Sequence, residues 1–222
     1  MQLLYKIRKR YKQTSYPVLS SQEAYRQWAD KYPPLPHNPL MQAEHEGMKN
    51  LMPNLQNCTV LDLACGTGRW GKWALENGAN FVIGIDNSIS MLKSAELAQR
   101  MQADMTTLPL ASNSIDVVLC GLALGHLPSY AMQATFHEFS RVLKLKGVAL
   151  ISDFHPILAW TGAQRTFQGK DGKTYAVQHH IHSYADYFAA SQKANLQLTG
   201  VQEPVQPQTQ KPLVLVLRLT KS

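Results

Sequence analysis

Short apolar runs alternate with amphipathic segments from residue 59 onward, and this pattern predicts strands joined by single helices. The apolar runs expected to form buried strands span 60–63, 81–85, 115–120 and 148–151. Apolar residues recur at helical spacing in the segments 88–98 and 132–143, and the segment 69–76 is also able to form a helix. Strands that are buried on both faces and joined by single helices form a parallel sheet covered by helices on both sides. The predicted fold class is therefore α/β.

The pattern differs in the two terminal regions. Apolar residues at helical spacing predict two amphipathic helices around 25–32 and 41–52, separated by a proline-rich stretch. Near the other end, the apolar runs 196–201 and 213–219 are joined without a helix, which predicts an antiparallel pair of strands. The polar segment 202–210 between them contains two prolines and predicts a surface loop.

Residues 155–182 interrupt the alternation after the strand at 148–151. They contain the turn-forming sequence Gly169-Lys-Asp-Gly172 between short extended runs, and we expect them to form a cap over the sheet. The chain is therefore divided into an N-terminal basic tail and helical lid, 1–57, and an α/β domain, 58–222, that carries the cap as a substrate-covering insertion.

Composition limits the possible classes of protein. Of the 222 residues, 45% are apolar, yet no apolar run approaches the ~20 residues that span a bilayer. No signal peptide is recognisable, so we expect a cytoplasmic protein without a membrane span. The net charge is +7, but five positive charges lie within residues 1–12, where a solvated terminus is expected. The three cysteines have no CxxC spacing and indicate neither a disulfide framework nor a zinc site.

The segment from Val60 to Gly71 is the most informative, because a strand runs into small residues and then into a helix. Small residues let a ligand approach the backbone at a helix N-terminus. Gly66, Gly68 and Gly71 match the fingerprint GxGxxG, and Asp86 stands 20 residues after Gly66, where an acid binds ribose hydroxyls. Nicotinamide dinucleotides and S-adenosylmethionine both contain such a ribose, so this match leaves both cofactors open.

Two further acids favour a cationic ligand. Asp62 lies at the end of the strand, four residues before Gly66, where it would repel a pyrophosphate but attract a sulfonium and an α-ammonium group. Asp104, near the end of a third strand-like segment, is placed to accept a hydrogen bond from an adenine amine. For both residues the alternative is a carboxylate that only braces a loop.

Five ordered motifs resemble those of the class I S-adenosylmethionine-dependent methyltransferases. They are most similar to the small-molecule group that includes the ubiquinone and menaquinone biosynthesis enzymes. The motifs span 60–68, 82–92, 103–110, 114–119 and 141–147. The resemblance covers about 59–153 and implies a Rossmann-like, seven-stranded sheet of order 3-2-1-4-5-7-6 whose last strand is antiparallel.

The resemblance also implies which residues bind S-adenosylmethionine. The candidates are Asp62, Ala64, Gly66 and Gly68 for the methionine part, Asp86 for the ribose, Asn87, Asp104 and Met105 for the adenine, and Cys120. Ala64 replaces the family's first glycine, and we expect its backbone to keep an ordinary φ. Residues 120–123 replace the Asn/Asp-Pro-Pro-Tyr of members that methylate nucleic-acid bases, so nucleic acid is not the expected partner.

The implied reaction is an in-line displacement, which depends mainly on alignment and on exclusion of water. A histidine base would assist where the acceptor must lose a proton. Because strands present ligands at their carboxyl ends, His126 and His155 are the candidate catalytic residues, although either could merely shape the pocket. Arg165 could pair with an anionic substrate or form a structural salt bridge. The histidines in 179–182 lack a nearby carboxylate or thiolate, so no metal is expected.

We therefore predict an enzyme that transfers a methyl group from S-adenosylmethionine to an oxygen, nitrogen or activated carbon of a small molecule, with an aromatic acceptor as the hypothesis. The aromatic residues Tyr25, Trp28 and Tyr32 are either core or the face of a lid that closes over both reactants. Three alternatives stay open: an NAD-dependent oxidoreductase, a non-catalytic protein that binds an adenosine ligand, and an RNA methyltransferase that uses the basic N-terminus.

Overall fold

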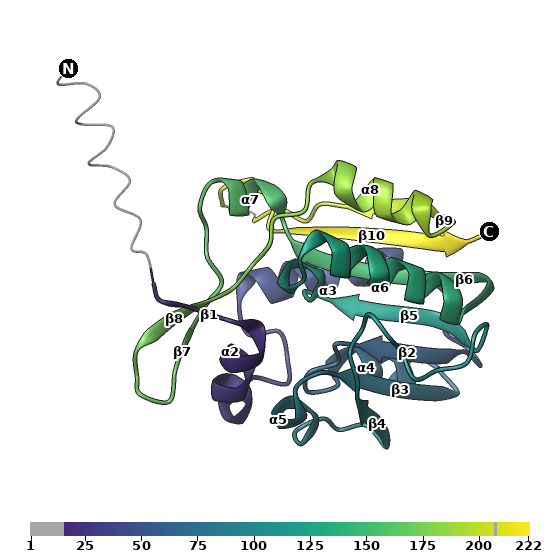
Figure 1. Ribbon diagram of the computed structural model, residues 1–222, viewed down its shortest axis with the longest axis horizontal. Coiled ribbons are helices and arrows are strands. Elements are labelled where there is room, and N and C mark those ends of the chain that lie inside the picture. Colours follow the sequence, from purple (N-terminus) through teal and green to yellow (C-terminus); the bar gives the residue numbers. More distant parts are fainter. Residues whose placement is uncertain (1–15, 207) are drawn as a thin grey trace.

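The computed structural model describes residues 16–206 and 208–222, and its centre is a seven-stranded sheet of order β4-β3-β2-β5-β6-β10-β9 (Figure 1). The strands are β2 (Thr59–Leu63), β3 (Phe81–Asp86), β4 (Gln99–Gln102), β5 (Ile115–Gly121), β6 (Leu143–Phe154), β9 (Leu196–Gln202) and β10 (Val214–Lys221). Neighbours from β4 to β6 are parallel, whereas β10 is antiparallel to β6 and β9. The predicted α/β class and strand order are confirmed. The basic residues 6–12 lie outside the described residues.

Two hydrophobic cores lie on opposite faces of this sheet. The helices that cover it are α3 (Pro39–Leu51), α4 (Arg69–Glu76), α6 (Ser129–Val142) and α8 (Tyr184–Lys193). Helices α6 and α8 share one core with Leu61, and Phe136 of α6 is fully buried there. Helices α3 and α4 share the other core with Val60, and Met48 of α3 is fully buried there. Adjacent strand residues thus supply opposite cores, as a doubly covered sheet requires.

The segment after β3 forms a shorter helix than predicted. We expected a helix over 88–98, but α5 (Ile89–Leu92) is a single turn that Ser88 caps. The chain turns back after α5 to place β4 beside β3. Leu97 then packs over the glycine loop, where a Cβ atom on Gly68 would lie 2.9 Å from Leu97 Cγ. Tertiary packing, and not a continued helix, therefore explains the apolar residues in this segment.

A second sheet joins the N-terminal segment to the cap. Its strands are β1 (Val18–Leu19), β8 (Thr174–Val177) and β7 (Thr166–Gln168), in that order. Helix α2 (Ser21–Trp28), followed by the 3-10 helix η1 (Ala29–Lys31), packs on this sheet, and the Trp28 ring stacks on Phe167 with centroids 5.3 Å apart. Helix α2 and the cap therefore form one unit beyond the carboxyl ends of the main strands (Figure 1). Helix α3, which the predicted lid included, packs on the main sheet instead.

Two short helices complete the connections. The 3-10 helix η2 (Leu124–His126) follows β5, and α7 (Pro156–Trp160) follows β6. Of all the helices in the described ranges, not one combines the length and the apolar character needed to cross a bilayer.

Candidate active site

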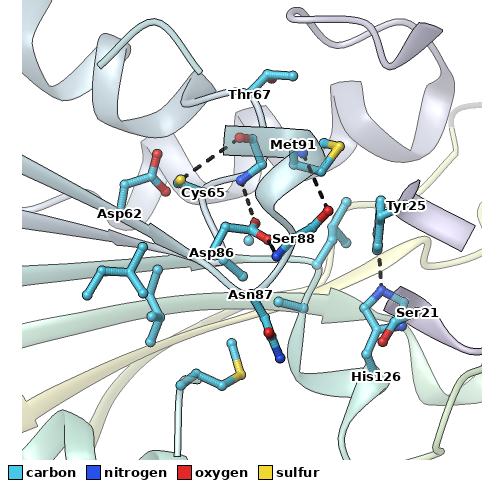
Figure 2. Close-up of a pocket in the computed structure, with 18 of the residues that line it drawn as sticks. Ser21, Tyr25, Asp62, Cys65, Thr67, Asp86, Asn87, Ser88, Met91 and His126 are labelled. Carbon is cyan, nitrogen blue, oxygen red and sulfur yellow. Dashed lines mark hydrogen bonds between the residues drawn. The ribbon is translucent and has the colours of Figure 1, made fainter. Parts of the chain in front are cut away.

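A cavity opens at the carboxyl ends of β2, β3 and β5, and α2 and the cap contribute to its wall (Figure 2). Together with its mouth, which is open to solvent, it encloses about 1100 Å³. In Figure 2, Asp62 and Cys65 lie on one side of the view, whereas Tyr25 and His126 lie on the other. The cavity thus has one wall from the sheet loops and another from α2, η2 and the cap.

The loop after β2 uses left-handed backbone at three positions. The φ angles of Ala64, Gly66 and Gly68 are 54°, 55° and 82°. Glycine adopts this conformation without a steric penalty, whereas alanine pays roughly 1–2 kcal/mol of conformational energy. The expectation of an ordinary φ at Ala64 is therefore wrong, because the turn keeps the geometry that suits the family's glycine. Leu122, at the end of β5, also has a φ of 55°, and strained residues of this kind gather at functional sites.

Asp86, the last residue of β3, ties two loops of the cavity together (Figure 2). Its Oδ2 accepts a hydrogen bond from the Gly66 N–H at 2.8 Å, and its Oδ1 accepts one from the Ser88 N–H at 2.7 Å. Burial raises the pKa of Asp86, while the two backbone hydrogen bonds oppose the rise. Each carboxylate oxygen can accept a further hydrogen bond. Asp86 is therefore held in place with acceptor capacity left over.

Asp104 follows β4 and belongs to the same wall. Its Oδ1 accepts hydrogen bonds from the N–H and the hydroxyl of Thr106 at 2.8 and 2.7 Å. No hydrogen bond from another described residue reaches Oδ2. Asn87 and Met105 also line the cavity. A free carboxylate oxygen beside amide and apolar groups suits a planar ring that carries an amine.

Asp62 is the buried carboxylate at the end of β2. Its Oδ2 accepts a hydrogen bond from the Gly71 N–H at 2.7 Å and so braces the start of α4. Burial raises the pKa of Asp62 to about 7, although the Gly71 hydrogen bond opposes the rise. A cation bound beside Asp62 would favour its ionised form. Loop bracing and attraction of a cation are compatible here, because the backbone occupies only one of the two oxygens.

Glu44 of α3 is fully buried and organises the wall next to the glycine loop. Its Oε2 lies 2.7 Å from Arg69 Nη2, and its Oε1 accepts hydrogen bonds from Trp70 Nε1 at 2.8 Å and from Ser152 Oγ at 3.2 Å. The other terminal nitrogen of Arg69, Nη1, is buried and has no hydrogen-bond partner in the described part of the chain. Arg69, which lines the cavity, is therefore fixed at one nitrogen and unsatisfied at the other.

Tyr25, His126 and Arg165 meet on the opposite wall. His126 Nδ1 lies 3.0 Å from the Gln178 carbonyl oxygen, which can only accept, so Nδ1 carries the proton. Nε2 therefore accepts a hydrogen bond from the Tyr25 hydroxyl at 3.1 Å, with Arg165 Nη1 a second donor at 3.3 Å. Burial, and then the charge of Arg165, lower the pKa of His126 to about 3. His126 is thus a neutral imidazole whose lone pair is already engaged.

Eight of the eleven predicted site residues line the cavity: Asp62, Ala64, Gly66, Asp86, Asn87, Asp104, Met105 and His126. The other three, Gly68, Cys120 and His155, are not part of its lining. Gly68 starts α4 and packs against Leu97, and Cys120 is fully buried in the core shared with α6 and α8.

His155, the other candidate catalytic residue, is also outside the cavity lining. It is fully buried, and its Nε2 lies 3.0 Å from Glu203 Oε1 and 2.8 Å from the Tyr184 hydroxyl. These contacts direct the imidazole toward α8 and the loop after β9. The structure therefore gives His155 a place in the packing of the cap and not beside the other site residues.

The cavity also contains residues that the sequence left undecided or unassigned. Tyr25 and Tyr32 were either core or lid, and both line the cavity. Arg69 and Ser21 were not assigned, although an arginine in the first turn of a helix after a glycine loop is a usable signal. For Arg165 the sequence left open pairing with an anionic substrate or a structural salt bridge, and within the described residues no ion pair with a carboxylate joins it.

The sheet order, the left-handed loop after β2, and the acids that follow β3 and β4 together define a class I S-adenosylmethionine-dependent methyltransferase fold. Residues 60–147 match the family model for a methyltransferase domain. The match covers the central part of the main sheet, and the fold of the chain is that of this class.

Similar proteins agree with this assignment. The chain is 34% identical over 119 residues to a demethylmenaquinone methyltransferase of Lactococcus lactis, covering 48% of this chain and 46% of the relative. It is 31% identical over 146 residues to a malonyl-[acyl-carrier protein] O-methyltransferase of Gallionella capsiferriformans, covering 60% and 48%. An S-adenosylmethionine-dependent methyltransferase structure from Mesorhizobium loti superposes with a TM-score of 0.68 at 21% identity, covering 81% of this chain and 98% of the other, which supports the fold. The chain spans about half the length of the curated relatives it matches.

Proposed function

We propose that the protein transfers a methyl group from S-adenosylmethionine to a small-molecule acceptor. The observation that carries this proposal is the position of Asp62, Asp86 and Asp104 on the wall of one cavity that also contains the glycine loop. Asp62 there attracts a sulfonium and an α-ammonium group and repels the pyrophosphate of a nicotinamide dinucleotide. The match to the methyltransferase domain family supports the same choice of cofactor.

The polar atoms of the wall fit the parts of this cofactor. Asp86 has acceptor capacity for the ribose hydroxyls, and Asp104 Oδ2 has capacity for the adenine amine. The second oxygen of Asp62 would balance the α-ammonium group. Nη1 of Arg69 is a buried charged donor without an acceptor among residues 16–206 and 208–222, and it fits the methionine carboxylate.

When bound, S-adenosylmethionine supplies an electrophilic methyl group, which an acceptor atom attacks in line as S-adenosylhomocysteine leaves. The residues of the chain bind and orient the two reactants and exclude water, and these effects suffice for such a displacement. The unit formed by α2 and the cap is the element that we propose excludes solvent.

His126 fits a positioning role better than that of a general base. A base is most effective when its pKa is near the working pH, whereas the pKa of His126 is lowered to about 3. Its lone pair already accepts the Tyr25 hydroxyl. The proposed reaction therefore relies on an acceptor that is nucleophilic without a histidine base, and His155 takes no part in it.

The acceptor side of the cavity combines rings, aliphatic groups and a few polar atoms. Tyr25, Leu122 and Leu127 line it together with His126 and Arg165. This surface fits a planar, partly apolar molecule, and an aromatic acceptor remains the proposal. The two curated relatives are named for different acceptors, demethylmenaquinone and a malonyl-[acyl-carrier protein], so their names do not select one for this chain.

Transfer of a tritiated methyl group tests the proposed function. The protein is incubated with labelled S-adenosylmethionine and a panel of phenols, quinols, amines and carboxylates, and we expect label in at least one small acceptor. Asp116 pairs with Lys144 at the opposite end of the sheet, so Asp116→Ala is a control that should retain the transfer. Cofactor binding without transfer to any acceptor would favour the non-catalytic alternative.

Cofactor binding is expected to weaken in acid because of Asp62. Burial raises the pKa of Asp62 to about 7, so below that pH the free protein holds a neutral acid that does not attract the cation. The dissociation constant of S-adenosylmethionine should therefore rise from about pH 8 to about pH 6, approaching tenfold per pH unit below the pKa. Calorimetry across this range checks it. Asp62→Asn should bind more weakly at pH 8 and lose this dependence, whereas an unchanged affinity in the native protein would contradict the assignment.

A further inference from the structure

One positive charge on the cavity wall has no directly paired acid. Arg165 lies in the cap between α7 and β7 and lines the cavity. Its Nη1 donates to the Leu122 carbonyl oxygen at 2.9 Å, and its Nη2 donates to the Tyr25 hydroxyl at 3.3 Å. Both partners are neutral, as is His126 beside them. Within the described residues, the guanidinium therefore keeps its full charge without an ion pair.

The acid that influences Arg165 from a distance is already engaged. Asp153 adds to the field at Arg165, but its Oδ2 accepts the Tyr187 hydroxyl at 2.5 Å and its Oδ1 accepts the Phe154 N–H at 2.7 Å. A largely buried cation without a paired anion is costly for the folded chain. A ligand that supplies the missing negative charge would offset this cost.

The N-terminus of helix α2 adds partial positive charge to the same wall. Ser21 and Gln22, in its first turn, line the cavity, and N–H groups in a first turn have no intrahelical acceptor. Ser21 and Tyr25 are four residues apart and so lie on the same helix face. Figure 2 shows both beside His126, on the side of the cavity away from Asp62. The positive end of α2 and Arg165 thus favour an anion at the same wall.

We propose that Arg165 selects an acceptor that carries a carboxylate and holds this group at the wall formed with Tyr25. This inference rests on the proposed methyl transfer and names its substrate class, a small organic carboxylate. A planar guanidinium matches a carboxylate with two parallel hydrogen bonds, and one unpaired charge suits a monoanion. Because pairing with arginine makes the carboxylate a weaker nucleophile, the carboxylate anchors the acceptor and a different atom receives the methyl group.

Binding of simple ligands tests this inference without turnover. The protein saturated with S-adenosylhomocysteine is titrated with benzoate and with benzamide, which has nearly the same shape and no charge. We expect benzoate to bind about tenfold or more tightly than benzamide, and Arg165→Gln to remove that difference. The affinity of the variant for benzamide and for S-adenosylhomocysteine should stay unchanged. Arg165→Lys keeps the positive charge but not the planar guanidinium, so it should restore part of the preference for benzoate.

The matched control is Arg26→Gln on helix α2, which substitutes another arginine outside the cavity lining. Arg26 is exposed and pairs with Glu23, so its loss should change neither titration. Equal affinity of the native protein for benzoate and benzamide would overturn the inference even if no variant folds. Equal benzoate affinity in the native protein and Arg165→Gln, or tighter binding of phenyl phosphate than of benzoate, would also overturn it. Absence of S-adenosylhomocysteine binding would instead refute the proposed function. A benzoate titration in the absence of S-adenosylhomocysteine then shows whether the preference for a carboxylate fails as well.

Discussion

Asp86→Ala is expected to weaken S-adenosylmethionine binding by about 100-fold or more. The substitution removes the acceptor for the ribose hydroxyls and also releases the N–H groups of Gly66 and Ser88. Hydrogen bonds to a charged group contribute about 1.5–3 kcal/mol each, so the loss of two corresponds to roughly 10²- to 10⁴-fold in affinity. Calorimetric titration of the purified variant measures the change directly.

The matched control for this prediction is Asp116→Ala. Asp116 also accepts a backbone hydrogen bond, from the Thr59 N–H at 2.9 Å, and pairs with Lys144, but it lies at the opposite end of the sheet. Its loss should affect stability without changing cofactor affinity. Equal affinity in Asp86→Ala and in the native protein would show that this carboxylate does not hold the cofactor.

Glu44→Ala is expected to destabilise the fold by about 3–5 kcal/mol, because removing one partner of a buried ion pair leaves the other charge uncompensated. Arg69, Trp70 and Ser152 would all lose a hydrogen-bond partner at a position where the Glu44 side chain is fully buried. For a chain of this size the midpoint of thermal unfolding should fall by about 6–20 °C. Circular dichroism during heating gives this midpoint.

Glu46 provides the comparison for Glu44. It lies on the same helix, α3, and is exposed, so Glu46→Ala should stay within about 0.5 kcal/mol of the native protein. Glu44→Gln keeps the shape and one acceptor oxygen, and an intermediate midpoint is expected. If Glu44→Ala and Glu46→Ala unfolded at the same temperature, the network around Glu44 would not stabilise the chain.

The main sheet could be predicted because its strands carry a strong and simple pattern. Runs such as Val60–Leu63 are buried on both faces and show no competing periodicity. The cofactor side of the site could also be predicted from the sequence. Asp62, Gly66 and Asp86 lie close to one another in sequence, at or just after the ends of strands. The edge strand β4 was indicated only as a strand-like segment, because its residues are exposed and, apart from Met101, polar.

The rest of the site depends on packing that a local pattern does not encode. Strand ends indicate which edge of the sheet a residue approaches, but not the direction of its side chain, so His126 reaches the cavity while His155 turns toward Glu203. Arg165 joins Tyr25 across 140 positions of sequence, and only the folded cap brings them together. The left-handed φ of Ala64 is likewise imposed by the surrounding loop and not by the preference of alanine.

One set of calorimetric titrations tests directly whether the acid-rimmed cavity binds S-adenosylmethionine. The native protein is titrated with S-adenosylmethionine, S-adenosylhomocysteine and NAD at the same pH and ionic strength. We expect one-to-one binding of the two methionine derivatives and no detectable binding of the dinucleotide, because Asp62 repels its pyrophosphate. Binding of NAD without binding of S-adenosylmethionine would contradict this expectation.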